Sequence, residues 1–385
     1  MNAIDTVKKI MAEFADSTGL SGVETSPRRY LWTDAFAVCN FIELYRQTKT
    51  ENWRRLALSL VDQVHYILGR HRRDDVRTGW ISGLSEDEGR RHPTAGGLRI
   101  GKPINERRPD DPFNQRLEWD RDGQYYHYLT KWMHALNRLS RSTGDAVFNL
   151  WAVELAKAAH SGFVHVWQNG TRRMYWKMSI DLSSPLVPSM GQHDPLDGLI
   201  TYHQLQATAV ELAEASPDLA LEIADMADLC RGKNWATEDP LGIGGLLTDA
   251  YKLVQLVMNN GFAENGLLQD LLDSSLWGID AFMQSNPLNL SVDYRLAFRE
   301  LGLSIGLRAV EKIRALAHAR QDEFNRIQHV YSPIDRLAHF IRLGETIERF
   351  WLETRNRESQ TWAEHRDINS VMLATSLMPD GYLEL

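Results

Sequence analysis

Hydrophobic residues recur along almost the whole chain with the three-to-four-residue spacing of α-helices. Some of the predicted helices are apolar or small-sided nearly all the way round, as in "LWTDAFAVCNFIELY" from Leu31, a pattern typical of helices buried on both sides. Their successors are amphipathic, with an apolar stripe on one face and arginine or glutamine on the other. Twelve helices are predicted, over residues 2–17, 30–48, 51–71, 122–143, 145–166, 195–215, 218–232, 243–260, 264–284, 292–319, 333–355 and 365–378.

This alternation of buried and half-exposed helices predicts an inner ring of helices wrapped by an outer ring. Six such hairpins form an (α/α)6 toroid, an all-α fold class, and we expect a single domain over residues 1–385. Two stacked helical domains are the alternative, although no linker rich in proline, glycine or serine separates them.

Two connections, residues 72–121 and 167–194, are much longer than the others. Connections of such length in a compact domain are usually functional or disordered. In a toroid, every connection from an outer helix to the next inner helix emerges where the inner helices begin. The sequence therefore predicts a pocket at the N-terminal ends of the even-numbered helices.

The second long connection contains a predicted β-hairpin, "FVHVWQNGTRRMYWKMSID", before the sixth helix. Asn169-Gly170 suits a two-residue turn, and apolar and polar residues alternate after it. The polar face, which includes Lys177, would line the pocket. A hairpin that only covers the core is the alternative.

Composition narrows the class of protein. The net charge of -8 argues against a nucleic-acid partner, because neutralising phosphates requires a basic surface. Cys39 and Cys230 are too few for a disulfide framework or a cysteine zinc site, and both are expected to be buried thiols. No apolar run is long enough to span a membrane and the first residues do not form a signal peptide, so we expect a cytoplasmic protein without a cofactor.

Carboxylates and tryptophans gather near the starts of the predicted inner helices. Aspartate is a favoured N-cap, so helix capping explains any one of these carboxylates. Tryptophan usually packs in a core, but six spread over separate connections to one rim predict a surface for stacking sugar rings. The carboxylates are Asp34, Asp120, Asp122, Asp194, Asp197, Glu238, Asp239, Asp293, Glu364 and Asp367. The tryptophans are Trp32, Trp80, Trp119, Trp176, Trp235 and Trp362.

Paired carboxylates beside aromatic rings fit the cleavage of a glycosidic bond, which needs one carboxyl as acid and another as base or nucleophile. We expect Asp122 and Asp197 in one cavity, with Asp34 and Glu364 nearby and Asp120 as the substitute. Asp122 precedes a glycine that permits close approach. Asp197 follows Pro195 by two residues, so it should lie within the first helical turn.

Basic and histidine side chains add two further hypotheses. Arg99 and Lys102 lie in an arginine- and glycine-rich part of the first long loop, where they would recognise an anion, or simply belong to a self-neutralised lid. His193 and His365 each adjoin a carboxylate and could shuttle protons instead. His127 shares a helix face with Lys131 and His134, which is also the ordinary polar side of an amphipathic helix.

The sequence resembles the six-hairpin glycosidase superfamily. "WTDAFAVCNFIELYRQTKTENWRRLA" is similar to the opening of unsaturated glucuronyl hydrolases, and "WDRDGQYYHYL" occupies the place of their tryptophan and paired aspartates, which implies Asp120 or Asp122 as acid/base. Glucoamylase-like toroids imply instead Asp194 or Asp197 with Glu364. N-acylglucosamine 2-epimerases share the barrel and use histidines, so the fold alone does not choose the reaction.

These observations together predict a glycoside hydrolase that acts on a short oligosaccharide able to carry an acidic group. A sugar epimerase and a non-catalytic sugar-binding toroid are the alternatives, and the oligomeric state is left open. The residues expected to carry catalysis are Asp122, Asp197, Asp120 and Glu364. Those expected to contact substrate are Trp32, Asp34, Trp80, Arg99, Lys102, Trp119, His127, Trp176, Lys177, His193, Asp194 and His365.

Overall fold

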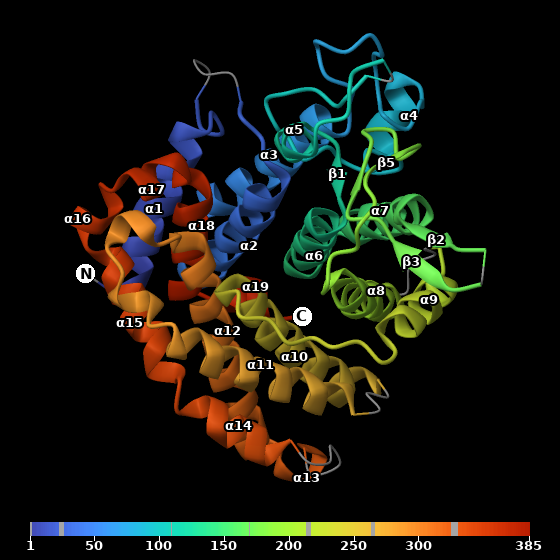
Figure 1. Cartoon of the computed structure of the whole chain (residues 1–385). Coiled ribbons are helices and arrows are strands. Elements are labelled where there is room, and N and C mark those ends of the chain that lie inside the picture. Colours follow the sequence, from blue (N-terminus) through green and yellow to red (C-terminus); the bar gives the residue numbers. More distant parts are fainter. Residues whose placement is uncertain are drawn as a thin grey trace. The chain divides into compact units, whose positions relative to one another are not determined.

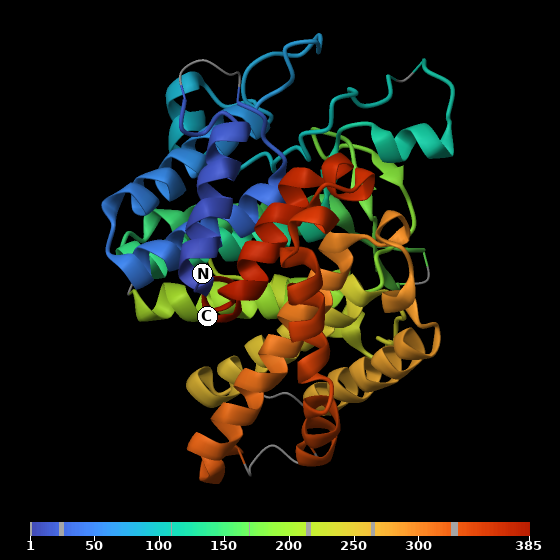
Figure 2. The same ribbon diagram turned by 90° about the vertical axis from the view of Figure 1, so that its left-hand side faces the viewer.

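Helices predominate in the computed structural model, and short strands occur only in the long connections among the described residues (Figures 1 and 2). The structure describes residues 2–22, 27–108, 110–168, 170–212, 217–262, 266–324 and 330–385. Contacts divide the chain into two compact units, one of Ala15–Arg231 and the other of Met1–Phe14 with Gly232–Leu385. Each unit is described by itself, and the single domain expected from the sequence stays a prediction.

The unit of Ala15–Arg231 is built from three helical hairpins. The first helix of each hairpin packs on its second, and the three first helices pack in the order α2, α6, α8. The hairpins are α2 (Leu31–Thr48) with α3 (Glu51–Leu68), α6 (Tyr126–Thr143) with α7 (Val147–Phe163), and α8 (Asp194–Glu211) with α9 (Ala220–Cys230).

Burial in the first hairpin follows the sequence pattern. Every residue of α2 from Leu31 to Leu44 is buried, whereas α3 buries a stripe that includes Trp53, Leu60 and Val64. The predicted difference between inner and outer helices is therefore confirmed for this hairpin. Cys39 is buried, and Cys230 is half-buried rather than buried as expected.

The other unit repeats this plan. Helix α12 packs on α10 and α18, α11 packs on α10, and α14 and α15 pack on α12. A side chain at Gly244 would collide with the Gly302 carbonyl, which explains the two glycines where α10 meets α12. The larger helices are α1 (Ala3–Ser17), whose residues up to Phe14 belong here, α10 (Pro240–Asn260), α11 (Leu267–Gln284), α12 (Ala297–Ala319), α14 (Tyr331–Ala338), α15 (Ile341–Leu352) and α18 (Arg366–Leu377). Short helices are α13 (Gln321–Phe324), α16 (Thr354–Arg357), α17 (Gln360–Glu364), α19 (Asp380–Leu383), η1 (Pro287–Asn289) and η2 (Val292–Tyr294).

Several predicted helix ends were wrong. The helix expected over 122–143 begins only at Tyr126, because the preceding residues are extended and form strand β1 (Gln124–Tyr125). The helix expected over 292–319 starts at Ala297 after a 3-10 turn, and the one expected over 333–355 is broken between α14 and α15. Non-local pairing and turns, which periodicity does not report, decide these ends.

The two long connections of the first unit meet in a small antiparallel sheet. Its order is β1-β4-β5, and Gln124 of β1 lies opposite Met178 of β4 at the start of α6 (Figure 1). A separate pair, β2 with β3, confirms the predicted hairpin, although Asn169 of its turn lies outside the described residues. The remaining elements are α4 (Glu86–Arg91), α5 (Gln115–Asp120), β2 (Val164–Val166), β3 (Arg172–Met174), β4 (Lys177–Met178) and β5 (Pro185–Val187).

Gly123 lets β1 approach β4. Its φ of +148° lies in the region that favours glycine, and a Cβ there would come within 2.6 Å of the Met178 carbonyl oxygen. We expect Gly123→Ala to lower the free energy of unfolding by about 1–3 kcal/mol or more, measured by denaturant unfolding. Gly170→Ala is the matched control, because Gly170 also has a positive φ but nothing within 4 Å of its Cβ position. An equal loss of unfolding free energy in both variants would contradict the close contact between Gly123 and the Met178 carbonyl.

Candidate active site

Aromatic side chains from separate elements form a continuous row in the unit of Ala15–Arg231. The ring centroids of Trp32 and Tyr128 are 6.5 Å apart, and those of Tyr128 and Tyr125 are 5.2 Å apart. Tyr125 lies 6.3 Å from Trp119, which is 5.1 Å from Trp176. These five residues are called the aromatic row below. The row includes three of the tryptophans predicted to stack sugars, Trp32, Trp119 and Trp176.

The other predicted tryptophans do not join the aromatic row. Trp80 is buried under the guanidinium of Arg70 and against Gly89, so it packs the first long connection. Trp235 and Trp362 belong to the other unit, and both are buried.

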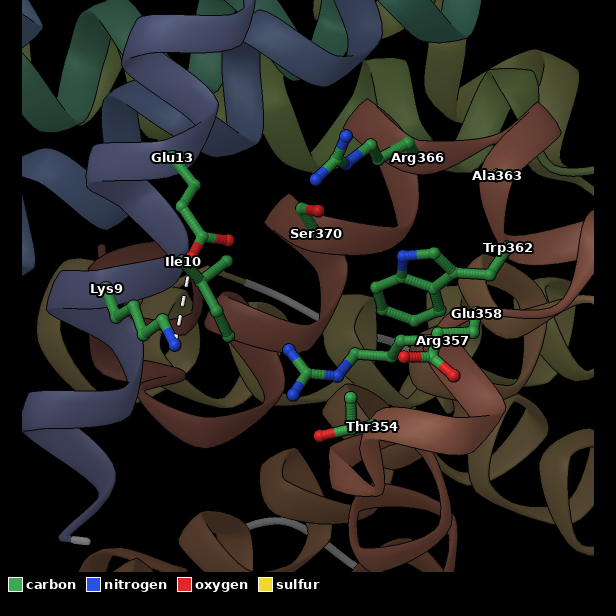
Figure 3. A pocket seen from close by; sticks show the side chains of 10 residues that line it. All are labelled: Lys9, Ile10, Glu13, Thr354, Arg357, Glu358, Trp362, Ala363, Arg366 and Ser370. Atoms are coloured by element: carbon green, nitrogen blue, oxygen red, sulfur yellow. Dashed lines mark ion pairs between the residues drawn. The ribbon is translucent and has the colours of Figure 1, made fainter.

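Trp362 stacks on a neighbouring ring and also lines a pocket of about 420 Å³ within its unit. Figure 3 shows its indole nitrogen facing the same space as the guanidinium groups of Arg357 and Arg366. None of the predicted catalytic carboxylates lines this pocket.

His127 joins the aromatic row to two carboxylates at the start of α8. Its ring stacks on Tyr125 with centroids 5.5 Å apart, and its Nδ1 lies 3.8 Å from Oδ1 of Asp194. Lys131, one turn along α6, places its Nζ 2.7 Å from Oδ1 of Asp197. Asp194 and Asp197 are called the acid pair below.

The first turn of α8 holds both members of the acid pair. Helix α8 begins at Asp194 with Pro195 in its first turn, and the Asp197 N–H donates to the His193 carbonyl at 3.0 Å. Asp197 therefore lies within the turn, as predicted. His193 occupies the N-cap position without a side-chain capping bond.

The surroundings of Asp194 and His127 make them different from ordinary surface groups. Burial, and then the nearby charge of Asp197, raises the pKa of Asp194 to about 8. Its Oδ2 is buried and has no hydrogen-bond partner among the described residues. Burial lowers the pKa of His127 to about 4, although 29% of the side chain is exposed. At neutral pH the site thus contains a protonated Asp194 next to a neutral His127. Beside them lies the ion pair of Asp197 and Lys131.

Asp122 is held in a different arrangement. One carboxylate oxygen accepts from Arg99 at 2.5 Å, and the other accepts from the N–H groups of Gly101 and Lys102 at 3.0 and 3.3 Å. Arg99 also donates to two carbonyls at the end of α3 and just beyond it. These bonds give Asp122 and Arg99 a structural role. The acid/base role of Asp122 and the anion-binding role of Arg99 stay predictions.

Gly123, expected to let substrate approach closely, instead lies against the Met178 carbonyl of β4. Asp120, the predicted substitute acid, is exposed at the end of α5. Asp34 is buried, where it accepts from the Tyr30 N–H at 3.0 Å and faces Arg29 at 3.5 Å.

Lys102 and Lys177 lie against the ring of Tyr125. Their Nζ atoms are 5.2 and 5.4 Å from its centroid. Lys102 donates to the Trp119 carbonyl, and the buried Lys177 donates to the carbonyls of Glu118 and Arg121. Both lysines therefore hold the backbone on either side of Trp119 next to the Tyr125 ring.

Glu364 and His365 belong to the other unit and are exposed. Glu364 accepts from Gln360 at 2.8 Å, and the His365 ring meets Phe298 edge-on at 5.5 Å. Their participation in catalysis or binding stays a prediction.

Sequence reasoning missed Lys131 as a partner of the acid pair and Tyr125 and Tyr128 as members of the row. The available signal was the spacing of four between His127 and Lys131, which places both on one helix face. Within the described ranges, no group of three or more histidine, cysteine, aspartate and glutamate side chains is arranged to hold a metal ion. Within the same ranges, no helix has the length and apolar character needed to cross a membrane.

Comparisons with solved structures identify the fold. A GH76 alpha-mannanase from Bacteroides thetaiotaomicron matches 98% of this chain and 96% of its own, with a TM-score of 0.55 at 9% identity. A cellobiose 2-epimerase from Spirochaeta thermophila matches 97% of this chain and 98% of its own, with a TM-score of 0.50 at 11% identity. No family model and no curated protein matches the sequence.

These matches confirm the fold class expected from the sequence, an all-α (α/α)6 fold with a small antiparallel sheet before the sixth long helix. An unsaturated glucuronyl hydrolase specific for heparin also matches, but with a TM-score of 0.32 over 71% of this chain. The particular likeness to that family therefore rests on the sequence motifs alone. At these identities the matches define the fold and leave the reaction to the site.

Proposed function

We propose that this protein is a carbohydrate-active enzyme, specifically a glycoside hydrolase that cleaves a short oligosaccharide with Asp194 as the proton donor and Asp197 as its partner. The observation that carries the proposal is the acid pair itself. Two carboxyls on one helical turn lie in surroundings that favour a proton on one and a negative charge on the other. Such a difference is the usual basis of acid/base assignments in glycosidases.

In this proposal the half-buried rings of Trp119, Tyr128 and Trp176 stack on the apolar faces of sugar rings, and the buried rings of Trp32 and Tyr125 support them from behind. Asp194 donates its proton to the glycosidic oxygen as the bond to the anomeric carbon breaks. Asp197, matched by Lys131, then acts on the anomeric carbon, either directly or through a water molecule that it deprotonates. The fold shared with an alpha-mannanase supports this reaction class.

An epimerase is the second candidate, and His127 is the observation that favours it. A neutral imidazole at the row can act as a base toward a carbon-bound proton next to the sugar's carbonyl group, with Asp194 protonating the neighbouring oxygen. The fold shared with a cellobiose 2-epimerase supports this candidate equally.

Parallel assays separate these candidates. Aryl glycosides and unsaturated uronides report bond cleavage, while free sugars incubated in deuterated water report isomer exchange by deuterium uptake. We expect cleavage that is lost in Asp194→Asn. Deuterium uptake without cleavage, lost in His127→Ala, would replace the hydrolase with the epimerase. Sugar binding with neither reaction would leave a non-catalytic sugar-binding protein.

The proposal also predicts a pH profile. We expect kcat/KM to fall as the pH rises through about 8, because the raised pKa of Asp194 is where the donated proton is lost. An aspartate without this shift would lose its proton near pH 4. The measurement is kcat/KM from pH 4 to 10 on the best aryl glycoside. A profile that already declines between pH 4 and 6 would contradict the assignment of Asp194.

A further inference from the structure

A cavity in the unit of Ala15–Arg231 has a strongly basic wall. It occupies about 910 Å³ and lies among residues 27–29, the end of α3, residues 70–79 and residues 99–103. Its lining holds seven arginine and lysine side chains and one aspartate, in a chain whose net charge is -8. The cavity is called the basic pocket below, and its cations are Arg28, Arg29, Arg70, Arg72, Arg73, Arg99 and Lys102.

Carboxylates around the basic pocket balance only part of this charge. Ion pairs hold four of the arginines, Arg29 with Asp34, Arg70 with Glu86, Arg72 with Asp74, and Arg99 with Asp122, and Arg28 donates to the Ser17 carbonyl. Arg73 and Lys102 have no carboxylate within 4.0 Å in the described parts of the chain. The pocket therefore keeps an excess of positive charge in a concave surface, which concentrates anions.

The wall also contains a buried guanidinium donor without a partner in the described ranges and an exposed aromatic ring. The Arg29 side chain is 0% exposed, yet its Nε has no acceptor among the described residues. Tyr66, 54% exposed, adds a flat ring with the Arg70 guanidinium 4.9 Å from its centroid. Arg29 Nε itself is closed off from the cavity, so the groups that a ligand can reach here are the Tyr66 ring and the partly exposed Arg70 guanidinium.

We propose that the basic pocket binds a small phosphate-bearing molecule. A phosphate group offers several strong acceptor oxygens and close to two negative charges, which match planar guanidinium donors and the excess charge of this wall. A carboxylate carries one charge and fewer acceptors. Lys102 lines the pocket and also contacts Tyr125 of the aromatic row, so the two sites are neighbours that share this lysine. This site does not depend on the reaction proposed above.

Calorimetric titration of the full chain with inorganic pyrophosphate tests the proposal, with sulfate and glucuronate as parallel ligands. We expect saturable pyrophosphate binding that weakens with added salt. Arg73→Ala should weaken pyrophosphate binding by about tenfold, because it removes one positive charge, and Arg73→Glu by about a hundredfold, because it also adds a negative one. Arg73 is exposed, so neither change should affect folding. Arg116→Glu is the matched control, an exposed arginine on α5 outside the pocket.

Two outcomes would overturn this site. One is the absence of saturable pyrophosphate binding, or equal weakening by Arg73→Glu and Arg116→Glu. The other is glucuronate binding more tightly than pyrophosphate with the same dependence on Arg73, which would assign the pocket to carboxylates.

Discussion

Replacing Asp194 with asparagine is expected to lower kcat/KM by about a hundredfold or more and to stabilise the folded protein at neutral pH. Asparagine keeps the shape of the side chain but has no proton to donate to a glycosidic oxygen. Asp194 makes no capping bond that the change would remove, because His193 is the N-cap. The rate loss is measured on the substrate that the wild-type protein cleaves best.

The gain in stability follows from the raised pKa of Asp194. In the folded chain the pKa is about 8, against 3.8 for an ordinary aspartate, so the folded state holds the proton more tightly than the unfolded state. Wild-type stability is therefore full below about pH 4 and declines as the pH rises toward 8. Asparagine lacks this titration, so the variant should be more stable by on the order of 1–3 kcal/mol at pH 8 and unchanged at pH 4.

Asp270→Asn is the matched control, since Asp270 is an exposed aspartate in the first turn of α11. It reports what losing a charge at a helix start does by itself. Full activity in Asp194→Asn would remove Asp194 from the mechanism. A stability difference from wild type that is the same at pH 4 and pH 8 would contradict the burial of an uncharged carboxyl.

Asp122→Asn should act in the opposite way, by destabilising the protein by about 3–5 kcal/mol while changing kcat of the remaining folded enzyme only a few-fold. The substitution leaves the buried Arg99 guanidinium without its carboxylate partner. Unfolding in denaturant, with activity corrected for the folded fraction, measures both effects. Asp120→Asn, two residues away and exposed, is the control and should change neither.

A normally stable Asp122→Asn variant that loses activity a hundredfold would instead support the catalytic role of Asp122 predicted from the sequence. Comparison with Asp197→Asn sharpens the distinction. We expect that variant to lose activity, with a smaller loss of stability than Asp122→Asn, because the Asp197–Lys131 pair is less buried.

The repeating helical part of the fold was predictable because burial imposes a local pattern. Helix α2 is buried along fourteen consecutive residues, and its sequence is apolar or small-sided on nearly every face. Helix α3 is buried along one face only, and its apolar residues form a stripe on that face. The start of α6 was not predictable in this way. Gln124 and Tyr125 pair with β4, far along the chain, and that pairing overrides the helical pattern at 122–125.

The candidate site was predictable in its neighbourhood but not in its roles. Residue types and loop lengths placed Trp119, Trp176 and His127 near one rim, and the structure brings them together. The sequence predicts Asp122 as an acid and Arg99 as an anion binder, and it does not report the ion pair that these two side chains form with each other. Nothing in the sequence near Asp194 reports its burial, which depends on side chains from other elements.

A structure of Asp194→Asn with a short oligosaccharide bound tests the central claim most directly. The account predicts sugar rings stacked on the aromatic row, with the glycosidic oxygen about 3 Å from the side chain at position 194 and the anomeric carbon facing Asp197. A sugar bound away from the aromatic row, or one whose glycosidic oxygen faces Asp122 or Glu364 instead, would contradict it.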